Sequence, residues 1–315
     1  MDKKSKIFVS GGYKMIGAEI LKVLEQKGYL NIVGRGDEEP DLLDQKAVKD
    51  FFNKTKPDYV IIAGGKSGGI AANQKYPADF MIDNLLSECF IIHEAYKNGV
   101  KKLLYLASSC SYPKLSAQPM KEEFLLTGHL ESTNESYAVA KIAGIKLCQA
   151  YRKQYDMNFI SAIPANVFGP GDDFSIEDSH VIGALITKIH NAIKNKEEKL
   201  IIWGTGKPRR DFIYVNDLAN ASIFLLDHYN NIEPINIGSN NDLSISDLAG
   251  IIKEITGYSG ELIFDTSKPD GMPLKILDTQ KINQMGWKPS WNMQDALKQT
   301  YQWFTHNICS SKIQE

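Results

Sequence analysis

Short runs of aliphatic and β-branched residues alternate with longer segments of helical apolar spacing through the first half of the chain. Continuous apolar strands separated by helices are typical of a parallel sheet that is covered on both faces. We therefore predict an α/β fold with a doubly wound parallel sheet. The predicted strands are Lys6–Ser10, Leu30–Val33, Tyr59–Ala63, Lys102–Ala107 and Asn158–Ala162. The predicted helices are Ile16–Gly28, Asn84–Asn98 and Tyr137–Tyr155.

After Pro170 the pattern loosens, and a smaller mixed α/β lobe is predicted to begin there. In the lobe we expect a helix over 181–195, a strand over 199–203 and a turn over 204–208. The run 213–215, the helix 217–229 and the strand 235–237 are predicted to return to the first sheet, before a helical section from 244 onward. The predicted domains are thus 1–170 with 211–240, and 171–210 with 241–315.

The charge balance and the cysteines exclude several classes of function. Lys and Arg (36) nearly cancel Asp and Glu (38), so no net field would attract nucleic acid or an anionic membrane. No apolar run reaches the roughly 18 residues of a spanning helix, and the N-terminus lacks the pattern of a signal peptide. The four cysteines show no CxxC spacing, which argues against structural zinc and fits a reducing compartment. We expect a cytoplasmic protein that binds no membrane and no metal.

A glycine-containing segment, Ser10–Gly17 (SGGYKMIG), joins the first predicted strand to the first predicted helix. A dinucleotide site needs glycine here for a tight turn, for close approach of the diphosphate and for packing of helix on strand. Gly11 and Gly17 meet the first and last needs, whereas Lys14 stands where a middle glycine is usual. The context predicts a Rossmann-type dinucleotide site in which Lys14 either displaces the diphosphate or adds a charge to it.

Tyr137 and Lys141 lie four residues apart on a predicted helix, which puts both side chains on one face. An ammonium near a phenol favours the phenolate, which lowers the tyrosine pKa toward the range of a general acid or base. The pair alone would be read as surface residues. Ser108, however, follows a predicted strand at the edge where α/β sheets bind ligands, and it can hydrogen-bond the carbonyl that Tyr137 protonates. Together they predict a nicotinamide-dependent oxidoreductase.

Cys110 and His180 form a second candidate pair. A thiol and an imidazole suit proton removal and return beside a carbonyl, because both can be tuned near neutral pH. Each could equally be structural, and their spacing does not show that they meet.

The segment Trp203–Arg210 (WGTGKPRR) offers an aromatic ring and cations, with Lys188 before it and Asp270 and Lys275 after it. A diphosphate attracts Arg and Lys, and an aromatic ring can stack on a base or sugar. Each cation alone would more often be a solvated surface charge. Together they indicate a site for a diphosphate-linked ligand.

With these motifs the sequence resembles the GDP-L-fucose synthase family of extended short-chain dehydrogenases, over about residues 7–304. The likeness rests on long stretches such as KKLLYLASSCSYPK (101–114), TNESYAVAKIAGIKLC (133–148), WGTGKPRRDF (203–212) and FDTSKPDG (264–271). It implies a 3,5-epimerase and 4-reductase of GDP-4-keto-6-deoxy-mannose. It also implies a homodimer built on a helix pair, and a smaller lobe that binds the nucleotide sugar.

The resemblance implies a role for each candidate residue. Ser108, Tyr137 and Lys141 would perform the reduction, with Tyr137 donating a proton to the C4 oxygen while nicotinamide delivers hydride. Cys110 and His180 would be the base and acid that invert C3 and C5 through enolates, because the C4 ketone makes those positions acidic. The implied cofactor-binding residues are Gly11, Tyr13, Lys14, Met15, Ile16, Gly17, Arg35, Asp37, Leu106, Ala107, Lys141, Pro164, Asn166, Val167 and His180. The implied substrate-binding residues are Ser109, Asn166, Lys188, Trp203, Arg210, Asp270 and Lys275.

The sequence departs from the family pattern at the adenosine end of the cofactor site. Two arginines that would grip the 2′-phosphate of NADP are replaced by Tyr13 and Asp37, which leaves Arg35. An acidic group about twenty residues beyond the turn suits a free ribose hydroxyl instead. NADP is the family expectation, and NAD is the alternative.

Three functions follow from the sequence. The leading one is an epimerase-reductase of a GDP-4-keto-6-deoxy-hexose that makes an activated sugar for surface polysaccharide. Ala165 and Leu274, which replace the usual Thr and a basic residue, leave open a C4 reductase or dehydrogenase of another GDP-sugar, such as a GDP-heptose. A non-catalytic protein that binds nucleotide sugar is the minor alternative.

Overall fold

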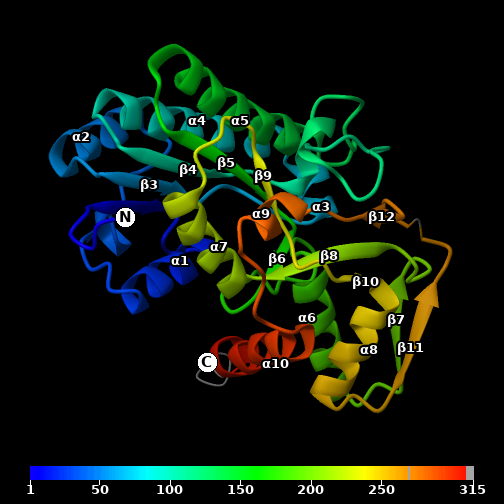
Figure 1. The fold of residues 1–315 in the computed structure, drawn as a ribbon. Helices are drawn as coiled ribbons and strands as arrows, with labels where there is room; N and C mark the ends of the chain where they lie inside the picture. The colour runs from blue at the N-terminus through cyan, green and yellow to red at the C-terminus, as the bar shows by residue number, and fades with distance from the viewer. Residues whose placement is uncertain (269, 310–315) are drawn as a thin grey trace.

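A six-stranded parallel sheet forms the centre of the computed structural model, which describes residues 1–268 and 270–309 (Figure 1). All residues of the strands β1, β4, β5 and β9 are buried, as expected for a sheet with both faces covered. The predicted doubly wound α/β fold is confirmed. In sheet order the strands are β2 (Ile32–Val33), β1 (Ile7–Ser10), β3 (Tyr59–Ile62), β4 (Lys102–Leu106), β5 (Phe159–Pro164) and β9 (Ile235–Ile237).

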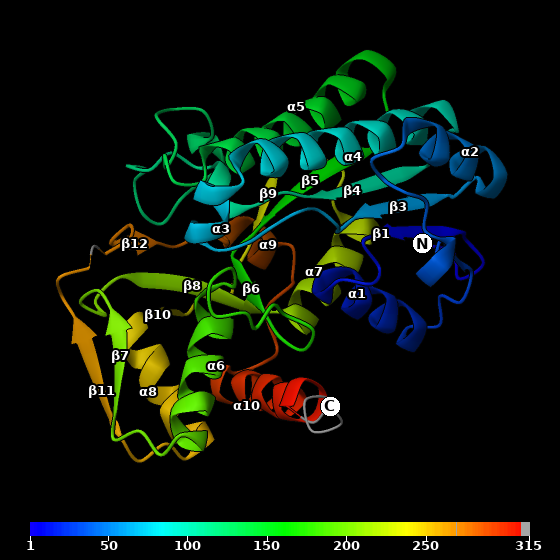
Figure 2. The ribbon, with the colours of Figure 1, turned by 180° about the vertical axis from the view of Figure 1, so that it is seen from behind.

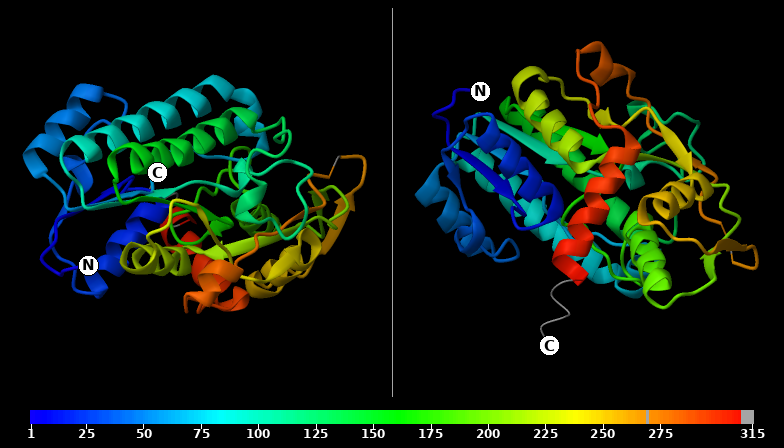
Figure 3. Two further views of the ribbon diagram at one scale, coloured as in Figure 1. Left: turned by 45° about the horizontal axis from the view of Figure 1, so that its top comes forward. Right: turned by 90° about the horizontal axis from the view of Figure 1, so that it is seen from below.

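Helices cover the sheet on both faces. Figures 1 and 2 show α2 (Gln45–Thr55), α4 (Pro77–Lys97) and α5 (Glu135–Tyr155) on one face, and α1 (Met15–Gln26) with α7 (Val215–His228) on the other. The left view of Figure 3 shows α4 and α5 side by side along the sheet. The short α3 (residues 70–75) leads into α4. This arrangement places the start of α1 and the start of α5 at the same sheet edge.

The winding of the sheet changes direction between β1 and β3. β2 pairs with one side of β1, and all later strands of the sheet are added on the other side, beginning with β3. Ligands of open α/β sheets bind at such a switch point, beyond the carboxyl ends of the strands. The loops that follow β1 and β3 therefore frame the expected ligand site.

A smaller lobe with its own hydrophobic cluster packs below the sheet edge. Its strands are β6 (Asn166–Phe168), β8 (Arg209–Tyr214), β10 (Asp242–Ser244) and β12 (Leu274–Lys275), and the parallel pair β7 (Lys199–Trp203) and β11 (Glu261–Asp265). Its helices are α6 (Val181–Lys194), α8 (Ile245–Thr256) and α10 (Met293–Phe304), with the short α9 (Gln280–Gln284) beside β9. Short helical turns lie at Gly36–Glu38, Ser109–Ser111, Glu122–Phe124 and Thr305–Cys309.

Two predictions about the later elements are wrong. The run 213–215 does not join the first sheet, because Ile213 lies in β8, which pairs with β6, β10 and β12, and Val215 begins α7. The section after residue 244 is not wholly helical, since it contains β11 and β12. β11 is only partly buried and β12 has two residues, so neither carries a strong apolar signal. The helix α7 and the strand β9 do return to the first sheet, and the predicted domain boundaries stay a prediction.

Among residues 1–268 and 270–309, no helix combines the length and the apolar character needed to cross a membrane. The same residues contain no group of three or more His, Cys, Asp and Glu side chains placed to hold a metal ion. Residues 310–315, which the sequence analysis assigned to the smaller lobe, lie outside the described residues.

Candidate active site

The glycine turn after β1 is packed so closely that side chains do not fit in it. Gly11 has a φ of +71°, and a Cβ there would lie 2.5 Å from the Cα of Gly64 in the loop after β3. A Cβ on Gly17 would lie 2.2 Å from the Gly11 carbonyl oxygen. The first N–H groups of α1, which begins at Met15, have no partner within the helix and attract anions. The turn therefore fits the diphosphate of a dinucleotide.

Lys14 lies at this turn and reaches across the switch point. Its Nζ donates a hydrogen bond of 2.7 Å to the carbonyl oxygen of Gly65, in the loop after β3. Burial lowers the pKa of the Lys14 ammonium, and Glu39 acts against that effect. This placement favours the hypothesis that Lys14 adds a charge near the diphosphate.

Glu39 contacts the glycine turn, and Asp37, which was predicted to suit a free ribose hydroxyl, does not. The Gly11 N–H donates to Glu39 Oε1, whereas Asp37 lies exposed in the turn 36–38. Arg35 forms an ion pair with Glu25 at 2.6 Å. Tyr13 is 72% exposed, so it is accessible to a ligand. The glycine turn thus has an acidic neighbour, Glu39, in addition to the exposed Asp37.

Ser108, Tyr137 and Lys141 come together between the end of β4 and α5. Lys141 Nζ lies 5.7 Å from the centre of the Tyr137 ring. Burial raises the pKa of Tyr137, while Lys141 and a hydrogen bond from Ser108 act to lower it. Lys141 thus acts in the predicted direction, but burial outweighs it and the pKa of Tyr137 is raised and not lowered. The phenol is therefore protonated at neutral pH, which is the form of a proton donor.

Lys141 is paired with a carboxylate that the sequence analysis missed. Its Nζ lies 2.6 Å from Oε1 of Glu88 on α4, and both residues are at most 3% exposed. The second oxygen of Glu88 accepts a hydrogen bond of 2.8 Å from the Tyr105 hydroxyl. Burial alone would lower the pKa of Lys141, but Glu88 and Tyr137 raise it above its ordinary value. The lysine is therefore held in its charged form.

Cys110 lies in the short helical turn Ser109–Ser111, two residues beyond Ser108. Its Sγ accepts hydrogen bonds from Nδ2 of Asn134 at 3.1 Å and from Nζ of Lys275 at 3.3 Å. Burial acts to raise the pKa of the Cys110 thiol, but Lys275, Ser108 and Asn134 outweigh it and the pKa is lowered. His180 directly precedes α6, and its side chain is open to the cleft. Loss of solvent around the imidazole lowers its pKa, and the charge of Lys275 lowers it further. Lys275 thus acts on both members of the predicted pair.

A cleft of about 380 Å³ lies between the two lobes and is lined by several of the predicted ligand-binding residues. Trp203 is 68% exposed, and Lys188 and Lys268 each place Nζ 5.5 Å from its ring centre. The predicted residues that line this cleft are Asn166, Val167, His180, Lys188, Trp203, Arg210 and Asp270. A second hollow of about 580 Å³ beside α7 contains none of the candidate residues. The chemistry therefore points to the smaller cleft.

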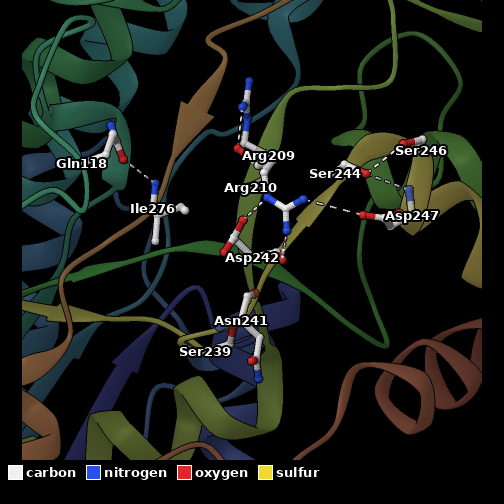
Figure 4. A network of polar contacts seen from close by, with 10 residues as sticks. All are labelled: Gln118, Arg209, Arg210, Ser239, Asn241, Asp242, Ser244, Ser246, Asp247 and Ile276. Carbon is white, nitrogen blue, oxygen red and sulfur yellow. Dashed lines mark hydrogen bonds and ion pairs between the residues drawn. The ribbon is translucent and has the colours of Figure 1, made fainter.

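Neighbouring arginines of β8 have different partners. Figure 4 shows Arg209 held by Asp242 and Asp247, with the longer contact at 3.8 Å. Arg210 donates to the backbone oxygen of Met272 at 2.6 Å and lines the cleft. Asp270 accepts from the backbone N–H and the hydroxyl of Thr205, at 2.8 and 2.6 Å. Asp270 thereby fixes the turn after Trp203, and Arg210, not Arg209, is the arginine of this pair that lines the cleft.

The remaining predicted residues lie at the ends of the strands. Leu106 ends β4 and Ala107 follows it, and Pro164 ends β5. Ser109 is 4% exposed, and its role as a substrate contact stays a prediction.

Three functional candidates, Glu39, Glu88 and Asn134, were missed in the sequence. Glu39 is one of three consecutive acidic residues, and spacing does not say which of them meets the turn. Glu88 sits in an apolar stretch of α4, and a carboxylate at such a position could have signalled a buried partner. Asn134 precedes α5 by one residue and resembles an ordinary helix start.

Comparison with known proteins gives consistent findings. The model of the NAD dependent epimerase/dehydratase family matches residues 7–238. GDP-L-fucose synthase 1 of Arabidopsis thaliana is 48% identical over 309 residues, which cover 98% of this chain and 96% of the relative. The resemblance predicted from the sequence is confirmed.

Solved structures show the same likeness. A GDP-6-OMe-4-keto-L-xylo-heptose reductase from Campylobacter jejuni superposes with a TM-score of 0.91 at 33% identity, over 97% of this chain and 99% of that one. A GDP-L-fucose synthetase from Naegleria fowleri bound to NADP has a TM-score of 0.89 at 30% identity, over 98% and 96%. Both structures cover the two lobes of this chain.

Proposed function

This chain belongs to the NAD dependent epimerase/dehydratase family, and from that premise we propose that it is a nicotinamide-dependent epimerase and reductase of a GDP-4-keto-6-deoxy-hexose. The reaction inverts C3 and C5 beside a C4 ketone and then reduces that ketone. The relative from Arabidopsis thaliana bears the name GDP-L-fucose synthase 1, which supports this substrate class.

One observation carries the proposal: Ser108 connects the reducing group to the epimerising group. Its hydroxyl accepts the N–H of Cys110 at 3.2 Å and also hydrogen-bonds Tyr137. A ketone oxygen bound between Ser108 and Tyr137 therefore has its neighbouring carbons beside Cys110. One carbonyl can serve both reactions.

For the reduction, a nicotinamide held at the glycine turn Gly11–Gly17 would supply the hydride for the ketone carbon. Ser108 orients the ketone oxygen, and Tyr137 donates its proton to that oxygen. Lys141, held charged by Glu88, stabilises the negative charge that forms on the phenol oxygen. Tyr137 thus supplies the proton to the ketone oxygen, where negative charge develops as the hydride arrives.

For the epimerisation, Cys110 removes a proton from a carbon beside the ketone and His180 returns one from the other side. The ketone oxygen carries the enolate charge next to Ser108 and the protonated Tyr137. Proton removal needs the thiolate, which fits the lowered pKa of Cys110.

The cleft supports a GDP group. Trp203 offers a ring face, and Arg210 and Lys188 offer cations for the diphosphate.

Replacing Cys110 with serine is expected to separate the two halves of the reaction. In heavy water the wild type should incorporate deuterium at C3 and C5 of GDP-4-keto-6-deoxy-mannose, and Cys110→Ser should slow this exchange by about 10²-fold or more, because a serine hydroxyl is a much weaker base. NADPH-dependent ketone reduction should persist in the variant. Nuclear magnetic resonance measures the exchange, with Cys89→Ser on α4 as control.

If the wild-type protein incorporated no deuterium at C3 or C5, the proposed epimerase activity would be excluded. The second candidate, a C4 reductase of another GDP-sugar such as a GDP-heptose, would then account for the protein, as the likeness to the Campylobacter jejuni reductase suggests.

We infer that NADP is the cofactor, which the NADP-bound neighbour supports, but that the acidic adenosine end weakens the preference over NAD. Asp37→Arg should raise the ratio of NADPH to NADH affinity by about tenfold, because a guanidinium bonds a phosphate and not a ribose hydroxyl. Calorimetric titration of both cofactors measures it. Glu38→Arg, an exposed neighbour with the same charge change, is the control, and an equal gain for both cofactors would contradict the assignment.

We also infer a homodimer in the cytoplasm. The packed helices α4 and α5 would provide the helix pair for the interface.

A further inference from the structure

The side chain of Lys275 ends at the Cys110 thiol. Its Nζ lies 3.3 Å from Sγ, which is within hydrogen-bond distance for sulfur. The two residues are 165 positions apart in the sequence, so the contact was not foreseeable from motif spacing. Lys275 was predicted to bind the substrate, and the wall of the cleft includes Arg210 and Asp270, whereas Lys275 and Cys110 both lie outside that wall.

The backbone around Lys275 is fixed from two sides. In β12, Lys275 pairs with Arg210 of β8. The next residue, Ile276, donates a hydrogen bond of 2.9 Å to Oε1 of Gln118, as Figure 4 shows, and accepts one of 2.8 Å from the N–H of Met120. Lys275 is therefore presented to Cys110 by paired backbone and not by a loose loop.

The ammonium of Lys275 has no carboxylate partner among residues 1–268 and 270–309. Its charge is consequently available to the thiol. The other titratable groups that face Cys110 are Tyr137 on α5 and Arg210 on β8, and His180 at the start of α6 lies close to Lys275. Lys275 is the cation among them that contacts Sγ directly.

We propose that Lys275 is a positioning residue for epimerisation, which holds Cys110 as the thiolate base. This assignment rests on the proposed epimerase function, and it replaces the diphosphate contact predicted for Lys275. An ammonium at hydrogen-bond distance favours the charged form of a neighbouring thiol. Asn134 supports the same form by donating to Sγ at 3.1 Å.

In the step itself, the Cys110 thiolate takes a proton from the carbon beside the ketone and becomes a thiol. The electron pair of the broken C–H bond moves into the enolate, whose charge rests on the ketone oxygen. Protonation from the opposite face by His180 restores the carbon with inverted configuration. Lys275 keeps its proton throughout. Its only effect on the reaction is to stabilise the negative charge of the Cys110 sulfur.

The test measures the thiol in the protein without ligands. Iodoacetamide alkylation of Cys110, followed by peptide mass spectrometry across a pH series, reports its thiolate fraction. Lys275→Met should slow alkylation of Cys110 at pH 7 by about tenfold and move the profile to higher pH, because the stabilising charge is lost. Lys275→Arg should keep the wild-type profile. Cys89, whose pKa is raised by burial and by Glu88, serves as the internal control and should not respond.

Deuterium exchange at C3 and C5 should fall in Lys275→Met and recover in Lys275→Arg. A Lys275→Met protein with an unchanged alkylation profile and only a higher KM for the GDP-sugar would overturn the proposal in favour of the diphosphate contact. A wild type without exchange, combined with the expected alkylation shift, would reject the epimerase function while leaving the Lys275 contact with the thiolate in place. Melting curves of both variants identify a loss of fold, and in that case Lys275→Arg alone decides, because it must keep the profile.

Discussion

Replacing Tyr137 with phenylalanine is expected to slow ketone reduction by about 10²–10⁴-fold, the usual contribution of a general acid. The ring still packs beside Phe80, but the proton that neutralises the C4 oxygen is gone. Deuterium exchange at C3 and C5 should continue, because Ser108 and Cys110 are untouched. Single-turnover oxidation of NADPH measures the reduction, and nuclear magnetic resonance measures the exchange.

The pH dependence gives a second expectation for this group. Burial raises the pKa of Tyr137 and Lys141 opposes it. A general acid must be protonated, so reduction should hold through neutral pH and fall as the pH rises through this raised pKa. Tyr155→Phe, at the far end of the same helix, is the matched control and should reduce at the wild-type rate. If Tyr137→Phe also reduced the ketone at the wild-type rate, another group would have to supply the proton.

The central sheet could be predicted because its strands are buried on both faces. Runs such as Lys102–Leu106 and Phe159–Pro164 are mostly apolar and are buried along their whole length, which is typical of parallel strands that are covered on both faces. The strand β8 was misassigned because its sequence is equally buried at its end while its partners lie in the other lobe. Composition identifies a buried strand but does not say which sheet it joins.

The residues of the candidate site that belong to local sequence motifs could be predicted. Ser108, Tyr137 and Lys141 are fixed by a strand end and by helical spacing. Glu88 and Lys275 act through contacts with residues 53 and 165 positions away, and no local pattern encodes such distances. Their importance arises from charge in a buried site, which becomes visible only when the elements are packed.

The buried pair of Glu88 and Lys141 should be the most sensitive polar contact for stability. Glu88→Ala leaves an ammonium buried without a partner, and loss of one member of such a pair costs about 3–5 kcal/mol in the free energy of unfolding. Chemical denaturation at neutral pH measures this. Tyr105→Phe removes only the hydroxyl that donates to the other oxygen of Glu88, so it should cost about 1.5–3 kcal/mol, the usual contribution of a hydrogen bond to a charged group.

The same pair should set the pH range of the reduction. Because the folded protein raises the pKa of Lys141, the stabilisation is present at neutral pH and is lost as the pH rises through that raised pKa. The free-energy gap between wild type and Glu88→Gln should therefore narrow in alkaline buffer. In Glu88→Gln, burial would lower the pKa of Lys141, so reduction should fail at a lower pH than in the wild type and recover on acidification. If Glu88 had a purely structural role, Glu88→Gln would lower the free energy of unfolding without moving the pH profile of kcat. That result would mean that Glu88 serves the packing of α4 on α5 and does not maintain the charge beside Tyr137.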